Sequence, residues 1–196
     1  MAPASNSRLG INSNAMSHLR EVVIESRRLK LLPASETYAR QIFEEFTSEI
    51  TTYMFPKPAD TIEDTLAFLK QAAMELETGE SLSVVIVTNA TGEFIGCGGL
   101  HHLQSRTPEL GIWTKLSSHG NGYGREAVMA LAHWALEHLN FDYLIYPVDR
   151  RNLPSRKIPE SLGGTIEAEY PKTNASGAVL DILEYRITPD SLRMPR

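Results

Sequence analysis

Three alternate glycines stand directly before a strongly periodic segment, and this arrangement constrains the fold more than any other part of the sequence. They are Gly120, Gly122 and Gly124, within residues 119–125. Glycine adopts left-handed backbone conformations at little cost and leaves its N–H groups open to a ligand. A helix N-terminus adds a partial positive charge at the same place. The sequence therefore predicts an anion-binding loop that opens a helix.

The segment after the loop has the period of an amphipathic helix. Its apolar residues recur at steps of three and four and form one stripe, whereas His133 and His138 fall off that stripe. The stripe consists of Val128, Leu131, Ala132, Ala135 and Leu139. We therefore expect one face of this helix to be buried.

The loop does not fit two common phosphate-binding motifs. A Walker A loop ends in Gly-Lys-Ser/Thr, whereas Arg125 and Glu126 follow Gly124 here. A dinucleotide-binding loop has the spacing G-x-G-x-x-G, whereas this one reads G-x-G-x-G. Asp149, after the apolar run 141–148, could still take the place of the ribose-binding acid. On the loop alone, a nucleotide enzyme and a plain glycine-rich turn before a core helix both stay open.

Other segments extend the pattern on both sides of the loop. Residues 108–113 read PELGIW before it, and residues 152–156 and 161–163 read NLPSR and SLG after it. The loop itself has His119 where the pattern Gln/Arg-x-x-Gly-x-Gly/Ala begins, and Gly122 and Gly124 at its small positions. With RLKL at residues 28–31, these motifs resemble, in the expected order, the acetyl-CoA site of the GNAT superfamily of N-acetyltransferases. The resemblance covers residues 22–188.

The resemblance implies both a fold and an activity. The fold is α+β, with a central mixed, mostly antiparallel sheet of about seven strands flanked by about four helices. The activity is transfer of the acetyl group of acetyl-CoA to a primary amine, with no metal. Within the superfamily the chain looks most like the RimJ/RimL-type branch that acetylates N-terminal alanines of ribosomal proteins. The acceptor would then be a protein N-terminal α-amine, attacked directly in a ternary complex.

The hydrophobic pattern predicts the individual elements. Strands are expected over residues 22–32, 82–88, 94–101, 109–114, 143–148, 165–170 and 179–188. Helices are expected from Ser35 through Ile50, over residues 60–76, after the glycine loop, and from Asn152. The aromatic loop 52–58 either lies by the acceptor, as the resemblance implies, or packs beneath the first two helices.

Composition excludes several classes of protein. A chain of 196 residues with 42% hydrophobic and 22% charged content can bury the core of one domain, expected over residues 16–196. Its formal net charge of −5 argues against a nucleic-acid partner. The single Cys97 excludes an internal disulfide. No apolar run approaches the roughly 20 residues of a membrane span. We expect a cytoplasmic protein, and the sequence does not decide between a monomer and a homodimer.

The first fifteen residues differ from the rest of the chain. They are polar and aperiodic, and residues 13–15, which read SNA directly before Met16, resemble a vector-derived scar. They also lack the apolar centre of a secretion signal. We expect residues 1–15 to be a vector-derived or disordered tail, with the native start at Met16.

The resemblance also assigns the binding residues. A backbone N–H on the strand around residues 112–114 would polarise the thioester carbonyl, with the pantetheine arm alongside. The N–H groups of residues 120–125 would hold the pyrophosphate. The residues expected to bind acetyl-CoA are Ile112, Trp113, Thr114, His119, Gly120, Asn121, Gly122, Tyr123, Gly124, Arg125, Asn152 and Ser155.

Glu109 is the expected catalytic base. Acetyl transfer requires that the amine lose a proton, and Glu109 would take it directly or through a water. It opens the strand that leads to the thioester and resembles a glutamate at that place in the family. An ordinary solvated carboxylate is the alternative. Because an α-amine has a reference pKa of about 7.7–8.0, against about 10.4 for lysine, it needs only a weak base.

Asn152 and Ser155 lie three residues apart, so they share one face at the start of a helix. The resemblance places Asn152 beside the pantetheine arm and Ser155 near the sulfur, where it could protonate the leaving thiolate; helix capping by Asn152 is the alternative. Many relatives carry a tyrosine acid four residues after Ser155, where this chain has Pro159. Gly164 likewise replaces an aromatic residue. Ser155 or solvent must then supply the proton.

Other functions stay open. The acceptor could be a small amine such as a polyamine, an amino acid or an aminoglycoside, and the missing tyrosine leaves room for a non-catalytic acyl-CoA-binding domain. We expect no metal site, because His101 and His102 would point to opposite faces of a strand and His133 and His138 do not have zinc spacing. Cys97 is expected to be a small buried apolar residue, with an acetyl-cysteine mechanism as a minor alternative.

Overall fold

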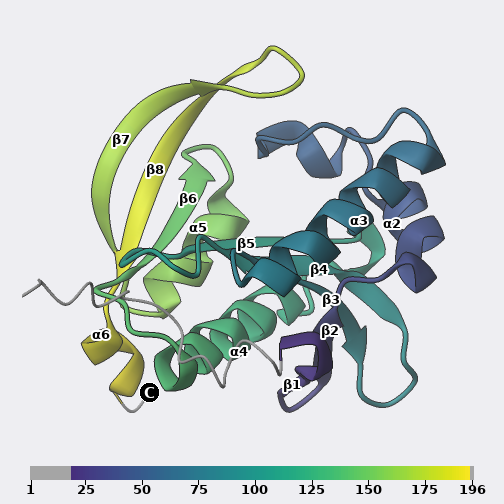
Figure 1. The fold of residues 1–196 in the computed structure, drawn as a ribbon. Coiled ribbons are helices and arrows are strands. Elements are labelled where there is room, and N and C mark those ends of the chain that lie inside the picture. Colours follow the sequence, from purple (N-terminus) through teal and green to yellow (C-terminus); the bar gives the residue numbers. More distant parts are fainter. Residues whose placement is uncertain (1–18, 195–196) are drawn as a thin grey trace, which may run out of the picture.

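The computed structural model describes residues 19–194, in which one sheet carries helices on both faces (Figure 1). The eight strands follow the order β1-β2-β3-β4-β5-β6-β8-β7. All neighbours are antiparallel except β5 and β6. The expected mixed, mostly antiparallel sheet is confirmed. The tail expected over residues 1–15 lies outside the described residues.

The first five strands form an antiparallel meander. They are β1 (Ile24–Glu25), β2 (Leu29–Pro33), β3 (Leu82–Thr88), β4 (Phe94–His101) and β5 (Glu109–Thr114). The prediction of one strand over residues 22–32 is wrong, because the chain turns at residues 26–28 and pairs Ile24 with Leu31. The Ser26 N–H donates to the Leu29 carbonyl at 2.8 Å and closes this hairpin. This division accounts for eight strands where about seven were expected.

The rest of the chain adds three strands and most of the helices. The strands are β6 (Leu144–Asp149), β7 (Thr165–Thr173) and β8 (Val179–Ile187). The α-helices are α2 (Ala39–Glu45), α3 (Ile62–Thr78), α4 (Tyr123–His138), α5 (Leu153–Ser161) and α6 (Pro189–Arg193), with 3-10 turns η1 (Leu19–Glu21), η2 (Glu36–Tyr38), η3 (Ile50–Tyr53) and η4 (Leu116–Ser118). The five-residue α6 is the helix that the sequence did not predict. No helix within the described residues is both long and apolar enough to cross a membrane.

The first two predicted helices had different outcomes. The helix expected from Ser35 through Ile50 is interrupted, because α2 ends at Glu45 and Ile50 begins η3; Ser35 makes no side-chain cap. By contrast, Thr61 accepts a hydrogen bond from the Asp64 N–H at 3.3 Å, and the Asp64 carboxylate accepts one from the Thr61 N–H at 2.9 Å. This capping box begins α3 where the sequence predicted.

Two cores lie on opposite faces of the sheet. Figure 1 shows α4 on one side and α2 with α3 on the other. The predicted stripe residues Val128, Leu131, Ala132 and Ala135 are all buried in the α4 core. Because side chains alternate along a strand, Leu110 and Ile112 of β5 join the α4 core, whereas Trp113 packs against the α2–α3 core.

The parallel strands β5 and β6 meet at one point and then separate. Their register contains a single pair, Glu109 with Ile145, at the start of both strands. In Figure 1, β6 runs away from β5 beyond this point. The sheet therefore opens into a gap between the C-terminal parts of β5 and β6.

Candidate active site

The gap exposes backbone groups of β5. The Pro108 carbonyl accepts a hydrogen bond from the Ile145 N–H of β6 at 2.8 Å, so this edge of β5 faces β6. Because backbone N–H and C=O groups of successive residues alternate between the two edges of a strand, those of Ile112 and Thr114 face the same edge as Pro108. The carbonyls of Gly111 and Trp113 face β4 instead, at 3.0 and 2.2 Å from the positions that a Cβ would take on Gly98 and Gly96. Since β6 has already diverged, the Ile112 N–H is a donor directed into the gap. The backbone of Trp113 is engaged by β4.

The glycine loop adopts the conformation that the sequence predicts. Gly120 and Gly122 have φ values of 77° and 75°, in the left-handed region. Gly122 is the N-cap of α4, so the N–H groups of Tyr123, Gly124 and Arg125 open the helix without intrahelical acceptors. A Cβ added at Gly124 would meet Ile158 Cδ1 at 3.6 Å and Thr114 Cγ2 at 3.9 Å, which is ordinary contact. The loop thus fits an anionic group such as the pyrophosphate of acetyl-CoA.

Two predicted binding residues stabilise the loop from within. His119 Nε2 lies 2.9 Å from the Thr114 carbonyl oxygen, which ties the loop to the end of β5. The Asn121 amide donates to the carbonyls of Ser118 and His119, each at 3.2 Å. Asn121 is also the one predicted binding residue that does not line the cavity described below. Its side chain shapes the loop.

The β1–β2 turn is anchored to the first turn of α4. The Glu126 carboxylate accepts from Ser26 Oγ at 2.8 Å and from both the N–H and the Nε of Arg28 at 2.7 Å. Burial opposes ionisation of Glu126, but these hydrogen bonds hold its pKa below the ordinary value. We did not predict this contact, because it joins segments about 100 residues apart whose charges look like ordinary solvated ones.

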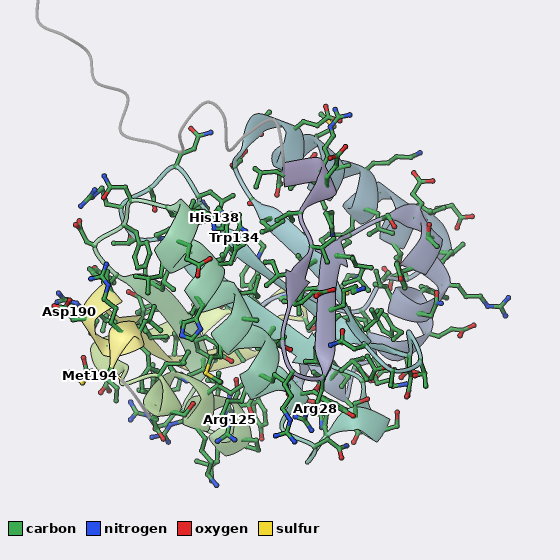
Figure 2. The ribbon with its side chains drawn as sticks, turned by 90° about the horizontal axis from the view of Figure 1, so that it is seen from below. Arg28, Arg125, Trp134, His138, Asp190 and Met194 are labelled. Carbon is green, nitrogen blue, oxygen red and sulfur yellow. The ribbon has the colours of Figure 1, made fainter. Side chains whose placement is uncertain are left out.

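Arg28 also lies against the glycine loop. Its guanidinium stacks over the Tyr123 ring at 4.6 Å, and Nη2 is 3.7 Å from the position that a Cβ on Gly122 would take. Figure 2 shows Arg28 and Arg125 near the N-terminal end of α4, opposite the end that carries Trp134 and His138. Arg28 therefore adds a positive charge where the loop and the helix offer N–H groups.

Asn152 and Ser155 meet at the start of α5. Asn152 Oδ1 accepts from the Ser155 N–H at 3.3 Å, so the helix cap is present. Ser155 Oγ lies 2.8 Å from the Tyr146 hydroxyl of β6. Burial raises the pKa of Tyr146, and the hydrogen bond with Ser155 acts in the opposite direction; the net result is a pKa of about 12. Nothing in the sequence singled out Tyr146, because an inward-facing tyrosine in a strand is an ordinary core residue.

The structure explains one departure from the family pattern. Pro159 lies inside α5, and its carbonyl accepts from the Gly164 N–H at 2.8 Å. A Cβ on Gly164 would lie 2.8 Å from that same oxygen and 3.1 Å from Ile187 Cγ1. An aromatic residue at position 164 would therefore require the backbone to move.

The expected acceptor loop lies between the α2–α3 side and the β7–β8 hairpin. The Phe55 carbonyl accepts from the Ala175 N–H at 2.9 Å, and the Met54 carbonyl accepts from Asn174 Nδ2 at 3.3 Å. Lys172 Nζ lies 4.4 Å from the centre of the Phe55 ring. The Phe55 side chain is 51% exposed, so this residue of the loop is not packed beneath the helices.

One cavity of about 1250 Å³ joins these parts. Its lining includes Glu109, Ser155 and all predicted binding residues except Asn121, as well as the aromatic loop and His101. Cys97 also lines it, but this thiol is buried in β4 and burial raises its pKa, which disfavours a thiolate nucleophile. The cavity is large enough for an extended ligand that passes through the sheet.

Three of the histidines expected to have no metal role, His102, His133 and His138, do not line this cavity. His138 Nδ1 is 2.8 Å from the Trp134 carbonyl oxygen, and its ring stacks on Trp134. His102 follows β4 with a φ of 57°. Within residues 19–194, no three His, Cys, Asp or Glu side chains come together as a metal site would require.

Comparison with known proteins gives the class. The family model for the acetyltransferase (GNAT) domain matches residues 28–165. The chain belongs to this family and is an N-acetyltransferase that depends on acetyl-CoA. No curated protein sequence matches it.

Solved structures show the same fold at low sequence identity. A RimL ribosomal α-N-protein acetyltransferase in complex with coenzyme A is 16% identical, with a TM-score of 0.75, over 87% of this chain and 99% of that one. An acetyltransferase from Salmonella typhimurium that modifies the N-terminal serine of a ribosomal subunit protein is also 16% identical, with a TM-score of 0.75, over 85% and 99%. A GNAT-family acetyltransferase from Bacillus anthracis is 20% identical, with a TM-score of 0.71, over 86% and 99%.

Proposed function

We propose that this enzyme acetylates a protein N-terminal α-amine by direct attack in a ternary complex. The observation that carries the proposal is the continuous cavity whose lining comes from both faces of the sheet at the β5–β6 gap. Acetyl-CoA would lie on the α4–α5 side and the acceptor on the α2–α3 side, so that the two meet at the gap. The structural similarity to RimL-type enzymes, whose acceptors are protein N-termini, supports this acceptor class.

The binding roles follow from the positions of the residues. The N–H groups at the start of α4, with the left-handed Gly120 and Gly122, would hold the pyrophosphate. The Ile112 N–H would donate to the thioester carbonyl as it gains negative charge in the transition state. Asn152 would hold the start of α5 and contact the pantetheine arm.

The proton transfers would take place on opposite faces of the sheet. Tyr146 belongs to the α4 core, so its partner Ser155 lies on that side, where it would protonate the departing thiolate. Glu109 is two and four residues from Gly111 and Trp113, so it shares the acceptor face and would supply the negative charge that draws the amine proton. Acid and base groups are therefore separated by the strand that polarises the carbonyl.

Thiol release from acetyl-CoA tests the acceptor class. Matched peptides with a free N-terminal alanine or serine should be used well, whereas the same peptides with a blocked N-terminus and one internal lysine should not. Polyamines, amino acids and aminoglycosides complete the panel. A kcat/KM for one of these small amines well above that of the free peptides would overturn the α-amine proposal.

A further inference from the structure

His101 occupies a position in the active site that the roles above leave unused. It is the last residue of β4 and the direct cross-strand partner of Glu109 in β5. Counting back in steps of two, it shares the sheet face of Gly99 and Cys97, and Cys97 packs in the α2–α3 core. His101 and Glu109 therefore lie side by side on the acceptor face, and both line the cavity.

The imidazole ring of His101 extends over the neighbouring strand β5, on the side of the β5–β6 gap. Its Nε2 is 3.4 Å from the position that a Cβ on Gly111 would take, and its Cε1 is 3.5 Å from the equivalent position on Gly99. Because neither glycine has a side chain, the imidazole ring can lie against the backbone of these two residues. Gly111 is bonded directly to the Ile112 nitrogen, whose N–H points into the gap. Glu109 lies two residues before Gly111 on β5, about 7 Å from it along the strand.

The surroundings keep this imidazole available as a base. Burial lowers the pKa of His101 below its ordinary value, and the positive charge of His102 acts in the same direction. The carboxylates of Glu109 in β5 and Glu75 in α3 oppose this shift. No side chain or backbone group within residues 19–194 forms a hydrogen bond with the ring. At neutral pH the ring is therefore largely uncharged, and a nitrogen remains free to accept a proton.

We propose that His101 is the residue that accepts the proton of the acceptor amine, with Glu109 as its positioning and charge partner. The amine nitrogen attacks the thioester carbonyl carbon, the C–N bond forms and the C–S bond breaks. The proton passes from nitrogen to His101 Nε2, and the thiolate receives a proton from Ser155 or solvent. The imidazolium then returns its proton to water. This inference rests on acetyl transfer to an amine but not on which amine is used.

The decisive comparison uses His101→Gln and Glu109→Gln, with His102→Gln as the matched control on the exposed neighbouring histidine. The rate is followed as kcat/KM from pH 5 to pH 9, with whichever amine the parent enzyme uses best. We expect His101→Gln to lose about 10²–10³-fold and to lose the acidic limb of the profile. Glu109→Gln should lose less than about tenfold, and its acidic limb should move to lower pH, because the charge that raises the pKa of His101 is gone. His102→Gln should keep the parental maximum of kcat/KM, and its acidic limb should move slightly to higher pH, because the charge that lowers the pKa of His101 is gone.

Two further measurements keep the result interpretable. Calorimetry should show that His101→Gln binds acetyl-CoA like the parent, and His101→Asn provides a second variant if the first does not fold. An NMR titration of the histidine Cε1 signals should show the His101 pKa below 6.5 and lower still in Glu109→Gln. The proposal is overturned if His101→Gln keeps the parental profile while Glu109→Gln loses the larger factor. A small-amine acceptor would refute the α-amine proposal and leave this test intact.

Discussion

At the scale of single residues, Gly122 combines two requirements that glycine meets at the lowest cost. Its φ of 75° lies in the left-handed region, and it is the N-cap of the helix whose N–H groups face the cavity. A side chain there would strain the left-handed backbone of the loop. The position therefore affects ligand affinity more directly than it affects the core.

We expect Gly122→Val to weaken acetyl-CoA binding by at least tenfold, about 1.4 kcal/mol, because the loop must leave the left-handed conformation. Isothermal calorimetry on the folded variant measures this. Gly92→Val is the control, since Gly92 has a φ of 71° with no atom within 4 Å of its added Cβ and does not line the cavity. Equal losses of affinity in the two variants would mean that backbone strain, and not the ligand loop, is responsible.

At the scale of elements, two short contacts position the helices that border the gap. Asn152 caps α5 and so places Ser155, and Glu126 joins the first turn of α4 to the β1–β2 hairpin through Arg28. Each contact involves the first turn of a helix, where backbone N–H groups have no intrahelical acceptor. Binding and helix stability are therefore coupled at both sites.

Asn152→Ala should destabilise the protein by about 1 kcal/mol, because α5 loses its cap. For a chain of this size that corresponds to roughly 2–4 °C in Tm. Asn152→Asp keeps the cap and should keep the Tm, so the KM for acetyl-CoA in this variant isolates any contact that the amide makes with the pantetheine arm. If the Asp variant has the parental KM, Asn152 serves the helix alone.

Arg28→Met should weaken CoA binding about three- to tenfold, with a loss that shrinks as salt is added, because the variant removes a partly exposed charge near the proposed phosphate site. The matched control is Arg40→Met, whose guanidinium pairs with Glu44 on the exposed side of α2. Binding titrations at low and high salt measure the difference. A salt-independent loss, or none, would leave Arg28 with only its contacts to Glu126 and Tyr123.

At the scale of the whole molecule, the proposed acceptor side is built from two loops distant in sequence. Asn174 is buried, donates to the Met54 carbonyl, and accepts from the N–H groups of Ser176 and Ala178. It therefore shapes the β7–β8 turn and attaches it to the aromatic loop. In the proposed arrangement acetyl-CoA would bind on the other face, so the two substrates should respond separately to this contact.

Asn174→Ala should raise the KM for the acceptor severalfold, because the aromatic loop loses its contact with the hairpin, and should leave the KM for acetyl-CoA unchanged. Two-substrate kinetics measures both constants. Ser176→Ala in the same turn is the control, because only the Ser176 backbone N–H is bonded to Asn174. A parallel rise in both KM values would show that the loops support the whole cavity and not the acceptor side.

Local signals in the sequence predicted most of the elements and the conformation of the glycine loop. The Thr61 capping box, the short turns that join the strands over residues 82–114, and the left-handed glycines each depend on neighbours within a few positions, so a short stretch of sequence is enough to predict them. The turn at residues 26–28 escaped prediction because Glu126, far along the chain, completes its hydrogen bonds.

Only the tertiary structure decided how the site is assembled. The divergence of β5 and β6 after one pair, the contact of Ser155 with Tyr146, and the placement of His101 beside Glu109 over Gly111 all join separate segments. The stability of these arrangements depends on how the sheet opens and how helices pack on its two faces, and no short stretch of sequence encodes either feature. The chemistry-bearing residue types could be read from the chain, whereas their pairing was set by the fold.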